Sequence, residues 1–379
     1  MASFSKHSTP SFRTLLSAIC ARCRPALQRA ADATDADRYV KRYRSVDFAL
    51  ALIVHFLKGL SSLRALQVTL DCSGRLTRQV KLGGISLAQL AQLTHRRPAE
   101  MWQPLIAELL AQVGGQLPPS LLRVVDSTFF ALAVDLMSRC WQRQFAPEAA
   151  GVKLTVIFDP DQYAPVACRI SIGGGSDAGE GPAVLPEGDI SGHIYLADRG
   201  FRNYGWLGQL IERGADFVTL AAANTHYQVL EELALDPTQP QIERDQMVRL
   251  GSHNAHNRMK SPVRRIVLFD GKRRLIFLSS IFDLAAVQVC DLYRRRWEIE
   301  VFFRWLKRQI GCLRPLGYSA QAAEHTIFAA LVAYLLVLLM ALHTRRYPDD
   351  PPAMAQTLYR MQADLHDRPT TTYLQVLRL

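Results

Sequence analysis

The chain has 379 residues, 49% of them hydrophobic, which is enough apolar material for cores in two or three domains. Its 45 Lys and Arg side chains outnumber its 34 Asp and Glu, and the formal charge of +11 favours a polyanionic partner, nucleic acid before a membrane. Seven scattered cysteines, an odd number, argue against a disulfide framework and for a reducing cytoplasm.

The chain up to about Gly115 is predicted to be helical. Apolar residues recur at helical spacing in three stretches, which begin at Phe48, Leu87 and Trp102. The first 31 residues contain no acid, so they fit either an organelle transit peptide or a basic helix that touches DNA.

Two cysteines near the N-terminus, Cys20 and Cys23, have the local spacing of zinc ligands. No second Cys/His pair follows them at a suitable interval. This favours a position for Cys20 in the core of an N-terminal helix over a metal site.

Glycine and proline pairs between residues 114 and 119 mark a boundary, after which strands are predicted. Two apolar strands end in an acid: Leu121 to Asp126, and His193 to Asp198. Further elements are strands Lys153 to Phe158, Ala167 to Ile172 and Asp216 to Leu220, and a helix from Tyr204 to Arg213. The glycine-rich segment Gly173 to Gly181 lacks phosphate-loop spacing, so no nucleotide role is assigned to it.

The pattern changes again between residues 221 and 282. Val229 to Leu235 suggests a short helix, and Gln246 to Leu250 a strand. Arg265 to Phe269 and Leu275 to Leu278 are expected to pair as a hairpin through Asp270-Gly271. Basic residues crowd this part of the chain, with Asp270 as their one acidic neighbour: Arg258, Lys260, Arg264, Arg265, Lys272, Arg273 and Arg274. A second basic run follows at Arg294, Arg295 and Arg296. A basic run is usually a solvated face, but two runs that flank one carboxylate favour a surface that binds successive phosphates.

A charged stripe lies on the next predicted helix, which runs from Tyr293 to Lys307. At about 100° per residue, four polar side chains fall within roughly 60° of one another: Tyr293, Arg296, Glu300 and Lys307. Apolar residues share a neighbouring face, as a core-facing stripe should. One acid between two cations and a tyrosine suits metal binding beside a phosphate backbone. An ordinary solvated face is the plainer alternative.

The longest apolar run, Ile327 to Leu342, has 16 residues. It is short for a membrane span and is therefore predicted to be a buried core helix. A short polar tail is expected from Pro348 onward.

Three carboxylates stand out: Asp126 and Asp198 at the ends of buried strands, and Glu300 on a helix. An ionised acid at the edge of a core is costly unless a cation compensates it. Taken singly, each acid is better explained as a turn or helix cap. Taken together they suit a pair of Mg²⁺ ions, which would activate a water or a 3′-hydroxyl and stabilise the leaving oxygen of an in-line phosphoryl displacement.

These motifs resemble those of the DDE transposases. Asp126-Ser127-Thr128 comes first, Asp198-Arg199-Gly200-Phe201 second, and a Y-x2-R-x3-E-x6-K string third, at Tyr293, Arg296, Glu300 and Lys307. The string resembles the Y-R-E-K signature of the insertion-sequence four family. The resemblance covers about Val124 to Leu342, and more loosely the helical N-terminus.

The resemblance implies an α/β fold with an RNase H-like catalytic core, in which helices flank a mixed sheet and a β-rich segment is inserted. The implied parts follow in chain order: an all-helical DNA-end-binding region at 1–118, the first part of the core at 119–220, the β-rich insertion at 221–283, the closing helices of the core at 284–345 and a tail at 346–379.

It also implies cut-and-paste movement of an insertion sequence by metal-dependent DNA cleavage and strand transfer. The implied catalytic residues, which would hold two Mg²⁺ ions or Mn²⁺ in their place, are Asp126, Asp198 and Glu300. The implied phosphate contacts are Tyr293, Arg296 and Lys307. The implied partners are terminal inverted repeats, target DNA and a second copy of the chain in a homodimeric synaptic complex. The expected setting is the bacterial cytoplasm beside the nucleoid, with no membrane.

The sequence departs from its relatives at one point. Relatives cut through a DNA hairpin and flip a base onto a tryptophan of the insertion, but no tryptophan lies between Trp206 and Trp297. Tyr227 is a candidate substitute. The N-terminal helices would bind DNA, but no helix-turn-helix signature identifies the residues that would contact the bases.

Two other functions remain open at this level. The chain could be a non-catalytic or decayed DNA-binding derivative of a transposase, although all three acids are present. It could also be an RNase H-like nuclease without strand transfer.

Overall fold

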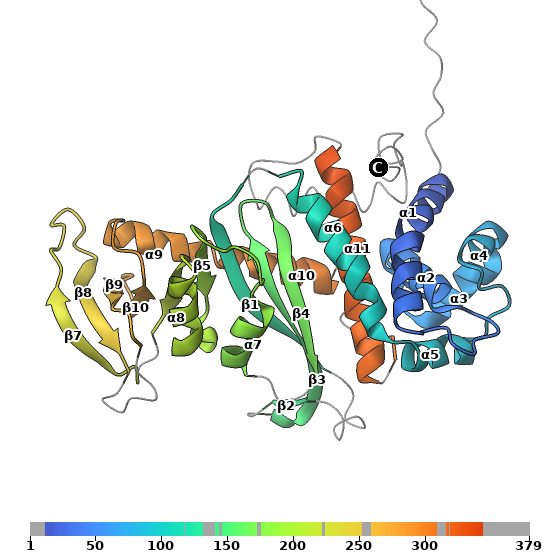
Figure 1. Ribbon diagram of the computed structural model, residues 1–379, viewed down its shortest axis with the longest axis horizontal. Coiled ribbons are helices and arrows are strands. Elements are labelled where there is room, and N and C mark those ends of the chain that lie inside the picture. The colour runs from blue at the N-terminus through green and yellow to red at the C-terminus, as the bar shows by residue number, and fades with distance from the viewer. Residues whose placement is uncertain are drawn as a thin grey trace, which may run out of the picture. The chain divides into compact units, whose positions relative to one another are not determined.

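A computed structural model describes residues 12–117, 119–131, 141–143, 146–172, 176–221, 224–251, 259–308, 316–317 and 319–343 (Figure 1). Arg258 of the basic run and the expected tail at 346–379 lie outside these residues. The chain divides into two compact units, which are taken separately below. The helical unit comprises Met1–Leu117, Phe130–Val152 and Phe302–Leu379, and the sheet unit comprises Pro118–Phe129 and Lys153–Val301.

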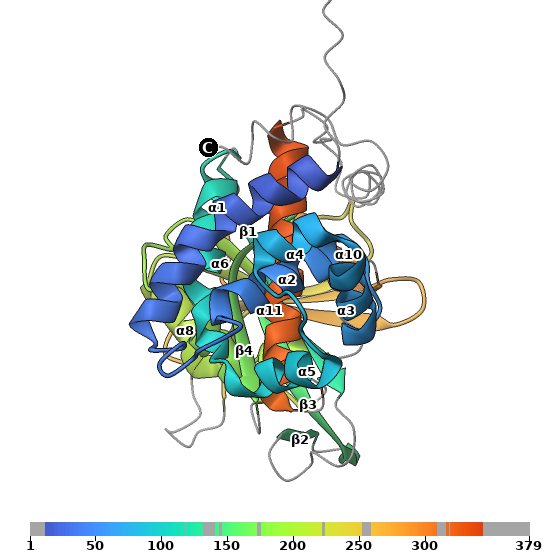
Figure 2. The same ribbon diagram turned by 90° about the vertical axis from the view of Figure 1, so that its right-hand side faces the viewer.

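The helical unit is built around two helices that are buried along their length. Its helices are α1 (Phe12–Ala33), α2 (Ser45–Leu57), α3 (Leu63–Cys72), α4 (Gly74–Val80), α5 (Leu87–Arg96), the 3-10 turn η1 (Ala99–Trp102), α6 (Gln103–Gly114), the end of α10 (Trp297–Arg308) and α11 (Ala320–His343). Every residue of α2 is buried. Helix α11 packs against α2, α5, η1 and α6 (Figure 2). The strand β2 (Trp141–Arg143) pairs with the start of β3 (Ala146–Asp159) in the same unit.

The apolar run at 327–342 lies in α11, and its prediction as a buried core helix is confirmed. Residues Ala320–Leu342 are long and apolar enough to cross a membrane, but 94% of their most apolar window is buried inside the protein. The polar groups of α11 are also paired, since the Trp102 indole donates to His325 Nδ1 at 2.8 Å and His325 Nε2 faces the Arg97 carbonyl at 2.9 Å. Burial lowers the pKa of His325 to about 4, so the ring is neutral.

Cys20 and Cys23 are both buried on α1, which confirms the core position expected for Cys20. Burial raises the pKa of the Cys20 thiol to about 11, so the thiol stays protonated and is a poor metal ligand.

The sheet unit contains one mixed sheet. Its strands are β1 (Leu122–Ala131), β3, β4 (Ala164–Ile172), β5 (Ile194–Ala197), β6 (Asp216–Leu220), β7 (Tyr227–Glu232), β8 (Ile242–Leu250), β9 (Val263–Phe269) and β10 (Arg274–Ser279). They are ordered β3-β1-β5-β6-β10-β9-β8-β7, with β4 paired to β3. Strands β1, β5 and β6 are parallel, and β6 to β7 continue as antiparallel neighbours.

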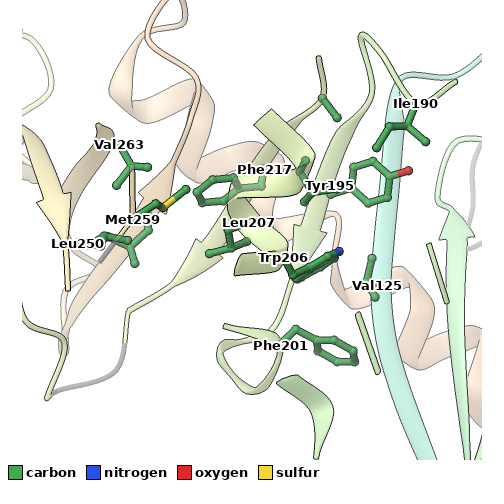
Figure 3. Packing of buried hydrophobic residues seen from close by; sticks show 14 of the residues in the cluster. Val125, Ile190, Tyr195, Phe201, Trp206, Leu207, Phe217, Leu250, Met259 and Val263 are labelled. Carbon is green, nitrogen blue, oxygen red and sulfur yellow. The ribbon is translucent and has the colours of Figure 1, made fainter. Parts of the chain in front are cut away.

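Helices pack on this sheet and close its core. They are α7 (Asp177–Val184), the 3-10 turn η3 (Arg199–Phe201), α8 (Tyr204–Glu212), α9 (Ala286–Arg294) and the first part of α10. Helix α8 packs on β6, α9 on β6 and β8, and α7 on β4 and η3. Val125, Tyr195 and Phe217, from three neighbouring strands, meet Phe201 and Trp206 in one buried cluster (Figure 3).

The strands predicted between residues 121 and 220 are confirmed, as are the helix after Asp198 and the hairpin of β9 and β10. The short helix expected from Val229 is wrong, because Tyr227–Glu232 forms strand β7 at the edge of the sheet. Backbone pairing with β8 determines that structure, and such tertiary pairing outweighs a local residue pattern.

The single helix expected from Tyr293 to Lys307 is also wrong. Helix α9 ends at Arg294, and α10 begins at Trp297 after a turn at Arg295 and Arg296. The turn is held from outside the segment, because Arg295 pairs with Asp161 and Arg296 with Asp126, each at less than 3 Å. No proline or glycine in the sequence marks this turn.

Candidate active site

The sheet register brings two aspartates together. Strands β1 and β5 are parallel neighbours, and their last paired residues are Val125 and Ala197. Asp126 and Asp198 follow this pair directly, so both carboxylates start from the same point along adjacent strands. Strand β1 continues to Ala131, so Asp126 lies within the strand rather than at its end.

Neither aspartate is explained by a cap. Asp198 occupies the N-cap position of η3 but makes no side-chain capping hydrogen bond. Asp126 accepts a 2.7 Å hydrogen bond from the backbone N–H of Ser127, inside a strand where no helix begins. The plainer explanation of each acid as a turn or helix cap is therefore not supported.

Arg296 ties the third acid to the first. Its guanidinium donates to Asp126 Oδ2 and to Glu300 Oε1, each at 2.8 Å. The Arg296 side chain is 15% exposed, that of Asp126 17% and that of Glu300 32%, so both ion pairs are partly shielded from water. The turn before α10 is what allows Arg296 to reach a strand that lies 170 residues earlier in the chain.

Burial raises the pKa of Asp126 to about 6, although the Arg296 charge and the Ser127 N–H lower it; the charges of Asp198 and Glu300 raise it further. Asp198 and Glu300 therefore both lie within electrostatic reach of Asp126. Burial lowers the pKa of Arg296, but its bond to Glu300 and the charges around it raise it by more, so the net shift is upward.

Tyr293 lies on α9 and faces the same group. Its ring meets Phe277 of β10 edge to face at 5.5 Å between centroids, and the Arg296 guanidinium lies 5.9 Å from its centroid. Burial raises the pKa of the Tyr293 phenol far above its ordinary value. The phenol therefore keeps its proton at neutral pH.

Lys307, the last residue of the predicted stripe, lies on the part of α10 that belongs to the helical unit. Its ammonium group stands 5.1 Å from the centre of the Phe130 ring in that unit. The other five predicted residues all belong to the sheet unit.

The donor chemistry fits a hard cation, because Asp126, Asp198 and Glu300 offer carboxylate oxygens. Within the described part of the chain, however, no three Asp, Glu, His or Cys side chains surround a single point where an ion could sit. Two of the three acids instead share the Arg296 guanidinium, whose positive charge stands where an ion's charge would be needed. The donor types thus fit a divalent metal, while in this structure Arg296 binds two of the three carboxylates.

The basic run in the insertion has mixed roles. Arg264 is buried and donates two hydrogen bonds to Asp245, at 2.9 and 2.6 Å, and Arg265 donates to Gln246 at 2.7 Å. For these two arginines the expected phosphate-binding surface is wrong, because they hold the sheet together. Lys272 lies exposed on the turn between β9 and β10. Tyr227 is 40% exposed on β7, with the Arg265 guanidinium 4.5 Å from its ring centre.

Two residues near the acids are not among the site residues predicted from the sequence. Trp297 opens α10 directly after Arg296 and is 55% exposed, which is unusual for an indole. Asp177 accepts a hydrogen bond from the Ser127 hydroxyl at 2.8 Å. The exposed Trp297 could be suspected from its place in the signature, whereas nothing in the sequence around Asp177 indicates its contact.

Comparisons with known proteins show the family of the chain. Residues 118–336 match the family model described as "Transposase DDE domain". The chain is 30% identical over 282 residues to "Putative transposase y4zB" of Sinorhizobium fredii, covering 71% of this chain and 75% of that protein. It is 27% identical over 248 residues to "Probable transposase for insertion sequence element IS5377" of Geobacillus stearothermophilus, covering 63% of each.

Among solved structures, one match is a cryo-EM structure of a piggyBac transposase synaptic complex with hairpin DNA. Its TM-score is 0.49 at 9% identity, and the match covers 96% of this chain and 81% of that one.

Proposed function

The chain belongs to the family of proteins with a transposase DDE domain and is a DNA transposase, and from this premise we propose that it moves an insertion sequence by cut-and-paste. The proposed reaction is metal-dependent hydrolysis of phosphodiester bonds at the element's ends, followed by strand transfer into target DNA. One observation supports it most: the parallel register sets Asp126 beside Asp198, and Arg296 ties Glu300 to Asp126.

In this proposal Asp126, Asp198 and Glu300 are the catalytic acids and the ligands of two Mg²⁺ ions, which Mn²⁺ can replace. Bound metal would supply a polarised water or 3′-hydroxyl and charge for the leaving oxygen. Ser127 holds one Asp126 oxygen through its backbone N–H, so the carboxylate is oriented before any ligand arrives.

Tyr293, Arg296 and Lys307 are the proposed DNA contacts. Arg296 now neutralises two acids, and a DNA phosphate offers the guanidinium a matching bidentate partner when metal takes over that charge. Trp297 presents an exposed indole beside it, on which an unpaired base could stack.

The wider proposal follows the sequence resemblance. It includes membership of the insertion-sequence four group, an RNase H-like core formed by the mixed sheet and its helices, end binding by the helical N-terminal region and a homodimer joining two ends. It places the protein in the bacterial cytoplasm. The β7–β10 segment is the proposed β-rich insertion.

Supercoiled DNA that carries the element's ends provides the test, with Mg²⁺ present. Wild-type protein should cut at the ends and join them to target, whereas Asp126→Ala and Glu300→Gln should bind the DNA without cutting it. Cleavage that survives either substitution would refute the assignment of these acids. End binding by wild-type protein without any metal-dependent cleavage would favour a non-catalytic derivative, and cleavage without joined product would favour a nuclease.

Lys307 is tested separately through salt dependence. If it contacts a phosphate, Lys307→Ala should weaken binding on all DNA sequences alike and lower the slope of log affinity against log salt by about 1. An unchanged slope would remove Lys307 from the DNA contacts.

A further inference from the structure

Asp177 is a carboxylate that the acid triad does not account for. It is the first residue of α7, where a negative charge is favourable because of the helix dipole. Its Oδ1 accepts two hydrogen bonds, from the Ser127 hydroxyl at 2.8 Å and from the Lys153 ammonium at 2.9 Å. Lys153 is buried on β3, so the carboxylate has a cationic partner of its own.

Through Ser127, Asp177 reaches the first catalytic aspartate. The Ser127 backbone N–H donates to Asp126 Oδ1 at 2.7 Å while its hydroxyl donates to Asp177. A single serine thus links the two carboxylates, with its backbone N–H bonded to Asp126 and its hydroxyl to Asp177. Residues 127 and 177 are 50 positions apart, so this link exists only in the folded chain.

The other side of Asp177 faces the turn that follows Asp198. A Cβ atom added to Gly200 would lie 2.8 Å from Asp177 Oδ2, which is closer than atoms pack, and 3.3 Å from its Cβ, which is a tight contact. The same turn is tied to α7 by Asn203, whose side-chain amide donates to the Ala178 carbonyl at 3.1 Å. The Asp-Arg-Gly motif therefore needs glycine at its third position because Asp177 occupies the space.

We propose that Asp177 is a positioning residue that holds the Asp126 strand and the Asp198 turn at the spacing required for metal binding. This inference rests on the proposed function. Asp177 acts through its two neighbours, Ser127 on one side and Gly200 on the other.

The test compares Asp177→Ala with Asp177→Asn and with a control, Asp236→Ala. Asp236 is an exposed acid of the same unit that also accepts from a hydroxyl, that of Thr238 at 2.7 Å. Mn²⁺ binding to the free protein is measured by electron paramagnetic resonance, and end cleavage is measured at saturating DNA. Asp177→Ala should weaken Mn²⁺ binding and slow cleavage by about 10–100-fold, as loss of a group that orients a metal ligand typically does. DNA affinity without metal should not change.

Asp177→Asn keeps an oxygen for the Ser127 hydroxyl and should recover most of both losses, while Asp236→Ala should match wild type. If Asp177→Ala binds Mn²⁺ and cleaves as wild type does, the positioning role is refuted. If wild-type protein itself cuts no end DNA, the proposed function fails instead, so the two failures are distinguishable.

One further variant, Ser127→Ala, keeps the test valid if Asp177→Ala does not fold, and a second, Gly200→Ala, applies where Asp177→Ala folds. Ser127→Ala removes only the linking hydroxyl and should weaken Mn²⁺ binding in the same direction; unchanged binding would overturn the inference. Gly200→Ala should impair Mn²⁺ binding strongly in the wild-type background but less with Asp177→Ala, where the closest contact relaxes from 2.8 to 3.3 Å. Equal impairment in both backgrounds would overturn it as well.

Discussion

Replacing Arg296 by glutamine should destabilise the protein without metal and make its stability depend strongly on Mg²⁺. Arg296 donates two charge-assisted hydrogen bonds of 2.8 Å, to Asp126 and Glu300. Each such bond contributes about 1.5–3 kcal/mol when buried, but Glu300 is 32% exposed, which reduces its share towards values for surface pairs. We expect the free energy of unfolding to fall by about 2–4 kcal/mol, because two carboxylates then face each other without a counter-charge.

The stability lost in Arg296→Gln should be larger at high pH than at low pH. Arg296 lowers the pKa of Asp126, so its removal raises that pKa above its present value of about 6. An acid with a raised pKa in the folded state contributes stability at low pH and loses it as pH rises through that pKa. The variant should therefore be more destabilised at about pH 8 than at about pH 5.

Urea unfolding with and without Mg²⁺ measures both effects. In wild-type protein the metal must displace Arg296 from the acids, whereas in Arg296→Gln it meets unpaired carboxylates, so Mg²⁺ should stabilise the variant by more. Arg294→Gln is the matched control, since Arg294 is 76% exposed and pairs with Asp291 on the surface; it should change stability by less than about 0.5 kcal/mol. If Arg296→Gln is as stable as the control, or gains no more from Mg²⁺ than wild type, the reasoning is refuted.

Cleavage should fall as pH drops below about 6, because burial raises the pKa of Asp126 to that value and a protonated acid cannot hold metal; a rate that stays flat to about pH 5 would contradict this. Burial raises the pKa of Glu324 to about 7, so the folded protein disfavours the charged carboxylate. Glu324→Gln should therefore stabilise the protein by on the order of 2 kcal/mol above about pH 7 and by little near pH 5. Thermal unfolding between these pH values measures the difference in stability. Gly181→Ala should cost about 1–3 kcal/mol, because its Cβ would lie 2.9 Å from the buried ring of Trp206, whereas Gly188→Ala has open space and should be nearly neutral in the same denaturation assay.

The sequence alone was sufficient for features that depend on neighbouring residues. Apolar runs of strand length ending in acids predicted β1 and β5, and the long apolar run predicted the buried helix α11. The types of the candidate residues and their order along the chain could also be read directly, because a motif is a local pattern. Periodicity reports which side of an element avoids water, and this requires no knowledge of the partner.

Only the tertiary structure decided features that depend on distant partners. The turn between α9 and α10 lies where Arg295 and Arg296 bind Asp161 and Asp126, which precede it by more than a hundred residues, so the charged stripe spans the end of α9, the turn and α10. β7 is a strand because β8 pairs with it, and Arg264 is structural because Asp245 faces it. Local patterns describe burial but not which distant group supplies a charge or a hydrogen bond. The packing of the folded chain determines these partners, including the two carboxylates that Arg296 binds.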